Sequence, residues 1–133
     1  MTTVRFYVSG GEFVGFKVTG HTGYAEEGSD IVCSAVSALT QTAVIGLTEV
    51  LKLPSAVEIK RAHLYFMLES GLDENSRREA QILFQTLRLG LGSIADTYGT
   101  YLKLVEKEVS HNDAHQSAAV RTQKGRRQLP QRP

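Results

Sequence analysis

Apolar side chains occupy every second position over two short runs near the start of the chain: Val4, Phe6 and Val8, then Val14, Phe16 and Val18. This period of two is typical of strands with one face in a core. Between the runs, Gly10 and Gly11 supply a tight turn. The pattern predicts a β-hairpin with one apolar face, followed by a loop from Gly20 to Ser29.

The next apolar residues recur at spacings of three and four, which is the period of a helix: Val32, Val36, Leu39, Ala43, Leu47 and Val50. They predict a helix from about Asp30 to Leu51, capped by Ser29 or Asp30. No charge occurs from Ile31 to Thr48, and by length alone this stretch is typical of a membrane span. A second, polar face of Ser and Gln residues at helical spacing favours instead a core helix packed on a sheet, which could also meet a second subunit.

The remaining pattern, over residues 57 to 108, predicts a strand region, a helix and a last strand. Residues 57 to 68 are rich in β-formers, but the segment 60–63 interrupts them, so one long strand and a short hairpin both fit. A helix follows from about Ser76 to Tyr98, with Ser76 and Glu79 at capping-box spacing, and residues 101–108 form a last strand. The order ββαβαβ predicts an α+β fold, with a mixed sheet of four or five strands and two long helices on one face.

Charge divides the chain into two parts. Residues 1–109 carry ten Lys/Arg and thirteen Asp/Glu, a net −3, whereas residues 110–133 carry five and one, a net +4; these sum to the overall +1. The second part has almost no large apolar residue and cannot offset its ordering entropy by burial. We therefore expect one domain over 1–109 and a disordered basic tail over 110–133. Its cluster at 124–127 could contact RNA, although a solvated extension is the simpler interpretation.

The single cysteine, Cys33, is the leading candidate for chemistry. It follows a glycine-rich loop and is expected in the first turn of its helix, where free N–H groups favour a thiolate and could hold an oxyanion. His21 lies at the other end of that loop and could act as its acid/base partner. Asp30 could cap the helix only, or also orient His21, while its charge would oppose a nearby thiolate. An inert buried cysteine is the alternative.

The remaining candidate residues, the cofactors and the cellular compartment are less strongly indicated by the sequence. Ser37 lies one helical turn beyond Cys33 and could hydrogen-bond near the site, whereas His63 is a conceivable alternative base within a strand. The loop lacks the lysine of a phosphate-binding loop, and the scattered histidines give no metal-ligand spacing, so no metal or cofactor is expected. One cysteine forms no internal disulfide, and the N-terminus shows no signal-peptide pattern, so we expect a cytoplasmic protein.

The residues around the loop closely resemble the signature of the ribosomal-processing cysteine protease family (Prp, also called YsxB-like). The resemblance spans about residues 3–109 and is carried by Gly20-His21-x-Gly23-Tyr24-Ala25-x-x-Gly28-x-Asp30-Ile31-Val32-Cys33-x-Ala35-Val36-Ser37-Ala38-Leu39-Thr40-Gln41-Thr42. It departs from the family at Ser34, where alanine is common, and is weaker around 61–63.

This resemblance implies a function in ribosome biogenesis. Cys33 would be the nucleophile and His21 its acid/base partner. The loop residues Gly20, Gly23, Tyr24 and Gly28 would order on the substrate. The substrate would be the twenty-seventh bacterial large-subunit ribosomal protein, from which an N-terminal extension is removed after two bulky apolar residues, typically phenylalanines, and before a small residue. Homodimers are implied; that no membrane contact is expected follows instead from the polar face of the helix predicted over about 30–51. The alternative hypotheses are a non-catalytic ribosome- or RNA-associated binding protein and, less well supported by a lone cysteine, a redox sensor.

Overall fold

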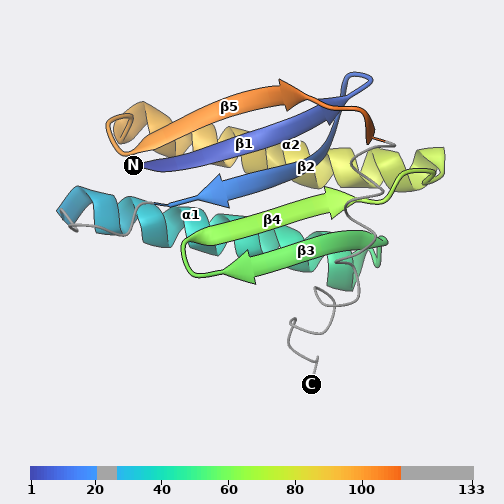
Figure 1. Cartoon of the computed structure of the whole chain (residues 1–133), viewed down its shortest axis with the longest axis horizontal. Coiled ribbons are helices and arrows are strands. Elements are labelled where there is room, and N and C mark those ends of the chain that lie inside the picture. The colour runs from blue at the N-terminus through green and yellow to red at the C-terminus, as the bar shows by residue number, and fades with distance from the viewer. Residues whose placement is uncertain (21–26, 112–133) are drawn as a thin grey trace.

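The computed structural model describes residues 1–20 and 27–111, which form one mixed sheet covered on one face by two helices (Figure 1). The elements in chain order are β1 (Thr2–Ser9), β2 (Glu12–Thr19), α1 (Glu27–Ile45), the π-helical turn η1 (Gly46–Val50), β3 (Ser55–Lys60), β4 (His63–Leu68), α2 (Glu74–Thr97) and β5 (Leu102–Glu108). The predicted α+β class, with its two helices on one face, is therefore confirmed.

The five strands lie in the order β3-β4-β2-β1-β5. β1 pairs antiparallel with β2 and parallel with β5, which makes the sheet mixed. Gly10 and Gly11 both have positive φ, as the predicted tight turn of the first hairpin requires. The open question over residues 57–68 is answered by a hairpin, because Ala62, with φ 58°, turns the chain between β3 and β4. The element order is therefore ββαββαβ and not ββαβαβ.

The core lies between the sheet and the helices. Four phenylalanines, one from each of β1, β2, β4 and α2, are fully buried there: Phe6, Phe16, Phe66 and Phe84. The rings of Phe16 and Phe66 stack with centroids 5.7 Å apart, and both contact Phe84 edge-on. Val14 does not join them, because a bulge in the β1–β2 pairing turns its side chain to the other face of the sheet, with Met67.

The buried stripe of α1 differs from the predicted one at two positions. Leu39 and Val50 are exposed by 38% and 65%, whereas Thr40 is buried at 1%. The Thr40 hydroxyl donates a hydrogen bond to the carbonyl oxygen of Val36 at 2.8 Å, which allows a polar side chain inside the core. The π-helical turn adds a residue to the last turn, and Val50 thereby leaves the stripe.

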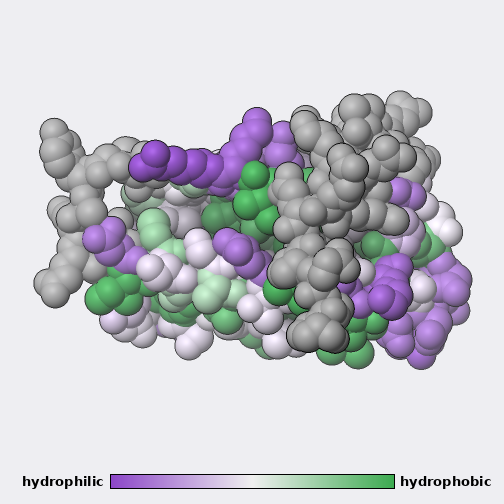
Figure 2. All heavy atoms as spheres, turned by 90° about the horizontal axis from the view of Figure 1, so that it is seen from below, coloured by the Kyte–Doolittle hydropathy of each residue, from purple (hydrophilic) through white to green (hydrophobic). Residues whose placement is uncertain are grey.

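The apolar stretch Asp30–Val50 is, by length and composition, capable of crossing a membrane. In the structure it is a core helix, because Val32, Val36, Val44 and Leu47 are buried beneath the sheet. Seen from below (Figure 2), the coloured part of the surface, which belongs to the described residues, mixes hydrophobic, intermediate and hydrophilic patches. These observations agree with the core-helix interpretation of the sequence.

Helix α2 begins two residues earlier than predicted, and its cap is Asp73, not Ser76. The Asp73 carboxylate accepts a hydrogen bond from the Ser76 N–H at 2.8 Å, which satisfies one of the free donors of the first turn. This hydrogen bond lowers the pKa of Asp73 below its ordinary value of 3.8. The charged form is thus the one that stabilises the folded state.

We expect the stabilisation from Asp73 to disappear in acid. Because its folded-state pKa is depressed, its contribution is fully present above about pH 5 and is lost as the pH falls through the folded value, below 3.8. Asp73→Ala should therefore lower the melting temperature at pH 7 but leave it nearly unchanged at pH 2.5. Thermal unfolding of both proteins across this range measures the difference, and a gap that stays constant with pH would contradict it.

Candidate active site

Cys33 lies on α1 where the helix passes the start of β1. Its Sγ is 3.2 Å from Oγ1 of Thr2, so thiol and hydroxyl form a hydrogen bond in which either group can donate. The cysteine is half-buried, while Thr2 is only 3% exposed. Thr2 reaches the thiol because alternate residues of β1 point toward the helices. The sequence analysis missed this residue, since the contact joins positions 31 residues apart.

A cleft of about 300 Å³ opens beside Cys33. Its lining comes from β1, β2, α1 and the β3–β4 hairpin: Thr2, Val18, Gly20, Cys33, Val36, Ser37, Thr40, Gln41, Ile59, Lys60, Ala62, His63 and Leu64. Val36 and Leu64 are buried and form an apolar floor, whereas Ser37 and Gln41 are exposed and leave the cleft open to solvent. An open cleft with apolar walls and a thiol at its edge can accept the side chains of an extended peptide.

Two of the predicted site residues share the cleft with Cys33. Ser37 follows it by one turn on the same side of α1, as expected from the helical spacing. Gly20 ends β2, and its N–H donates to the carbonyl oxygen of Ala62 at 3.0 Å. This bond fastens the end of β2 to the β3–β4 turn. The sheet therefore fixes the position of the cleft wall at Gly20, the residue that precedes His21 in the sequence.

Three further candidates, His21, Gly23 and Tyr24, lie outside the described residues, as does most of the basic tail, from residue 112 onward. The roles predicted for them stay predictions.

The start of α1 corrects the expectations for Gly28 and Asp30. The helix begins at Glu27, so Gly28 belongs to its first turn and not to a substrate loop ending at Ser29. Asp30 is the fourth helical residue, is exposed, and does not occupy a capping position. Only the first four N–H groups of a helix lack partners within it. All of these precede Ile31, so the N–H of Cys33, in the second turn, is not a free oxyanion donor.

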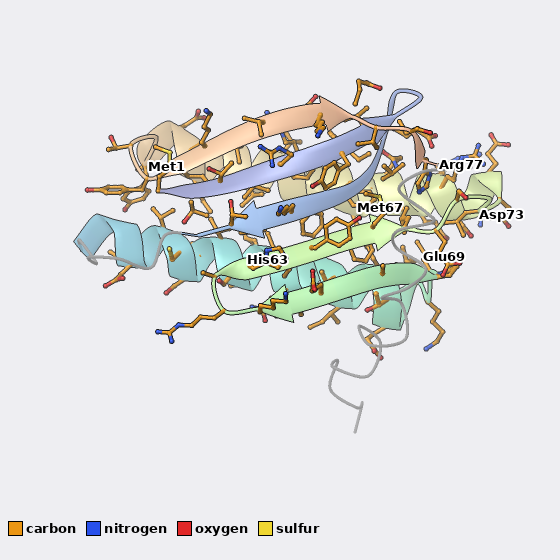
Figure 3. The ribbon with its side chains drawn as sticks, in the orientation of Figure 1. Met1, His63, Met67, Glu69, Asp73 and Arg77 are labelled. Carbon is orange, nitrogen blue, oxygen red and sulfur yellow. The ribbon has the colours of Figure 1, made fainter. Side chains whose placement is uncertain are left out.

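His63 is directed away from the thiol. Its neighbour Leu64 is buried toward the helices, so the His63 side chain projects from the opposite face of β4, where Figure 3 labels it. There its Nε2 lies 3.4 Å from Oε1 of Glu58, within ion-pair range but too poorly aligned for a hydrogen bond. The residue contributes to the cleft wall, yet its ring faces Glu58. This geometry disfavours His63 as the alternative base.

We expect Thr2→Val to slow peptide hydrolysis about tenfold. The two side chains have nearly the same shape, so the change removes mainly the hydroxyl, and a hydrogen bond to a charged group contributes about 1.5–3 kcal/mol. Steady-state kcat/KM on a model peptide measures the loss. Thr3→Val is the matched control, because Thr3 neighbours Thr2 but projects from the other face of β1. Equal rates for all three proteins would show that the Thr2 hydroxyl does not assist the thiol.

The sequence profile of the family described as cysteine protease Prp matches residues 1–103. The chain belongs to the Prp family of cysteine proteases. A relative from Bacillus subtilis, the ribosomal processing cysteine protease Prp, is 30% identical over 91 residues, which cover 67% of this chain and 81% of the relative. The predicted enzyme class, a cysteine protease of ribosomal processing, is confirmed by this membership.

Solved structures of Prp proteins share the fold. The essential ribosomal processing protease Prp from S. aureus, crystallised with a substrate peptide, superposes with a TM-score of 0.70 at 24% identity, over 80% of this chain and 100% of that one. A Streptococcus mutans protein gives the same TM-score and identity, over 82% and 96% of the two chains. At this identity the likeness establishes the arrangement of helices and strands.

Proposed function

We propose that this Prp-family protein is an endopeptidase that removes the N-terminal extension of a large-subunit ribosomal protein precursor, the twenty-seventh in the standard naming. One observation carries the proposal above all. The half-buried Cys33 thiol stands at the edge of an open peptide-sized cleft whose wall contains Gly20, the residue before His21. The family membership supports the same chemistry. We place the reaction in the cytoplasm, where a lone thiol stays reduced.

The proposed reaction uses Cys33 as nucleophile and His21 as acid and base. The Sγ thiolate attacks the scissile carbonyl carbon and forms a C–S bond. The C–N bond then breaks, and the His21 imidazolium gives its proton to the leaving amine. Water, deprotonated by His21, hydrolyses the thioester and regenerates the thiol. The Thr2 hydroxyl holds the sulfur at the cleft edge through the 3.2 Å contact.

The lining of the cleft suits apolar side chains ahead of the cleaved bond. Val18, Val36 and Leu64 form a buried apolar floor, and Ile59 adds a half-buried wall. Bulky apolar residues gain about 25 cal/mol for each Å² of surface removed from water, so such a floor selects them over polar ones. This preference agrees with the Phe-Phe pair that the resemblance implies before the cleavage site.

The direct test incubates the protein with the precursor of that ribosomal protein and identifies the products by mass spectrometry. We expect one cut directly after the two bulky apolar residues, and none with His21→Ala. Asp30→Asn, measured alone, tests whether Asp30 orients His21: an orienting carboxylate would lower the rate when replaced, whereas an exposed bystander would not. Precursor left intact by the wild-type protein would overturn the substrate assignment.

We further propose that the protein is a homodimer joined through its helix layer. On the side of the helices opposite the core, Ile31 of α1 and Ile82 and Leu89 of α2 are exposed by 52%, 62% and 75%. Large apolar residues left exposed on one layer of a protein are typical of interfaces between subunits. The sheet side, in contrast, is rich in charge.

We expect light scattering to give twice the 14.6 kDa chain mass for the wild-type protein. Leu89→Glu places a charge at the most exposed of these residues and should halve the measured mass. Glu74→Gln is a suitable control, because this residue is also exposed on α2 but lies in its first turn. A wild-type mass of one chain would contradict the dimer.

A further inference from the structure

The sheet face turned away from the helices, called here the open face, gathers positive charge. Strand pairing aligns its residues in rows across the sheet, and one row brings Tyr65, Lys17 and Arg5 side by side. The neighbouring rows end at Lys103 and Lys107 on β5 and at Lys60 on β3. The cations of the described strands on this face are Arg5, Lys17, Lys60, Lys103 and Lys107, and the carboxylates are Glu58 and, at the β1–β2 turn, Glu12, which pairs with Arg77.

Most of this charge is not neutralised within the protein. Lys60 pairs with Glu58 at 3.4 Å. Within residues 1–20 and 27–111, no carboxylate forms an ion pair with Arg5, Lys17, Lys103 or Lys107. The arginines of α2 are different, because Arg77, Arg78 and Arg88 each pair with a glutamate. The open face therefore presents a positive potential that the helix side lacks.

Two tyrosine rings lie among these cations. Tyr7 of β1 and Tyr65 of β4 are half-buried, with ring centroids 6.1 Å apart in an edge-on arrangement. They rest on a small apolar cluster that includes Val14 and Met67, which fixes their position on the strand surface (Figure 3 labels Met67). Burial raises the pKa of the Tyr7 hydroxyl above 10.0, partly offset by Arg5, so the ring carries no negative charge at neutral pH.

We propose that the open face binds single-stranded RNA. Cations spaced along a sheet hold phosphates, while the accessible part of half-buried aromatic rings between them can stack with unpaired bases. By charge, residues 110–133 do not complement this surface, since they carry five basic residues and one acidic residue; Val109, which precedes them, packs against the apolar cluster beneath the rings. A second copy of the chain would meet the same positive face. An acidic protein would satisfy the cations but would leave the two rings unused.

This inference goes beyond the proposed function, because Cys33 and the apolar floor of its cleft lie on the helix side of the sheet, and Lys60 and His63 at the cleft rim are the residues that the two surfaces share. RNA binding can therefore fail while peptide hydrolysis persists, and the reverse is also possible. Both activities would nonetheless place the protein near ribosomal components.

The test measures binding of a fluorescein-labelled oligouridine to the full chain by anisotropy. All proteins carry Lys124→Ser, Arg126→Ser and Arg127→Ser, so that the basic cluster of the tail does not contribute. Lys103→Glu combined with Lys107→Glu reverses two exposed charges on the open face. Lys52→Glu combined with Arg78→Glu makes the same charge change outside this face and serves as the control. Peptide hydrolysis and melting temperature verify that each variant is folded.

We expect the open-face pair to weaken binding at least tenfold and the control pair less than twofold. The slope of log K against log salt should fall by about 1.4, since each lost phosphate contact on single strands accounts for about 0.7. Tyr65→Leu should weaken binding about fivefold or more, and Tyr65→Phe should restore it, because stacking needs the ring and not the hydroxyl.

Three outcomes would overturn the proposal. The first is no measurable binding by the parent protein. The second is an equal loss in the open-face and control pairs, which would indicate a net-charge effect. The third is displacement of the RNA by polyglutamate at equal charge, together with no effect of Tyr65→Leu, which would make the face a surface for acidic proteins.

Discussion

Replacing Cys33 by alanine is expected to lower the rate of peptide hydrolysis to background, a loss of about 10⁴-fold or more. The proposed reaction forms a covalent bond to Sγ, so no other group in the cleft can substitute for it. The remaining lining is intact, because alanine is smaller and Cys33 is only half-buried. Steady-state hydrolysis of a peptide containing Phe-Phe-Ala gives the measurement. Substrate affinity should change little, which calorimetry with the same peptide can check.

Ser37→Ala is the matched control for Cys33→Ala. Ser37 lies one turn further along α1 and lines the same cleft, but it is exposed and has no proposed covalent role. We expect it to retain most of the activity. If Cys33→Ala kept more than a small fraction of the rate, or if Ser37→Ala lost as much, the nucleophile would have to be assigned elsewhere.

Gly15→Ala is expected to destabilise the fold by about 2–3 kcal/mol. Gly15 lies beside the bulge in β2, and a Cβ there would collide with the carbonyl oxygen of Phe66 and lie 3.1 Å from the Cα of Met67. Both atoms belong to the backbone of β4, so β2 and β4 would have to separate. Because domains of this size are stable by only about 5–15 kcal/mol, this is a large fraction of the total.

Gly90→Ala, the same substitution in a helix, is expected to increase the free energy of unfolding. A Cβ at Gly90 would meet only Cδ1 of Leu39 at 3.7 Å, an ordinary contact, and alanine is a better helix former by about 0.5–1 kcal/mol. Urea unfolding of both variants measures the two effects. A Gly15→Ala protein as stable as wild type would mean that the two strands are not held at this separation.

The strands and helices were predictable because their patterns are local. Alternation at Val4 and Phe6 gave β1, and the three-four spacing from Val32 to Leu47 gave α1. The predictions that were wrong concern features set by contacts beyond the local sequence pattern. The start of α1 lies three residues earlier than the sequence pattern predicts, and Thr40 enters the core in place of Leu39 because its hydroxyl bonds to the helix backbone.

The candidate site was predictable in part, for a similar reason. Cys33 and Ser37 share a helix, so their spacing placed them together, and Gly20 joined them through the loop motif. Thr2 could not be found this way, because only the pairing of β1 inside the sheet brings its hydroxyl to Sγ. The prediction that the N–H of Cys33 is a free oxyanion donor was wrong because the helix begins earlier than predicted. Residue propensities do not locate a helix boundary to within a residue or two.

The parallel pairing of β1 with β5 sets the order in which the site can be completed. Thr2 is opposite Leu102 in the sheet, although the two residues are far apart in the sequence, and its N–H donates a hydrogen bond to the carbonyl oxygen of Tyr101. Strand contacts across so long a sequence separation form late, because the whole intervening chain must first be ordered. The β1–β2 hairpin alone holds the strand that carries the Thr2 hydroxyl on one side, and β5 holds it on the other. A chain cut before β5 would therefore keep Cys33 beside a strand paired on one edge only.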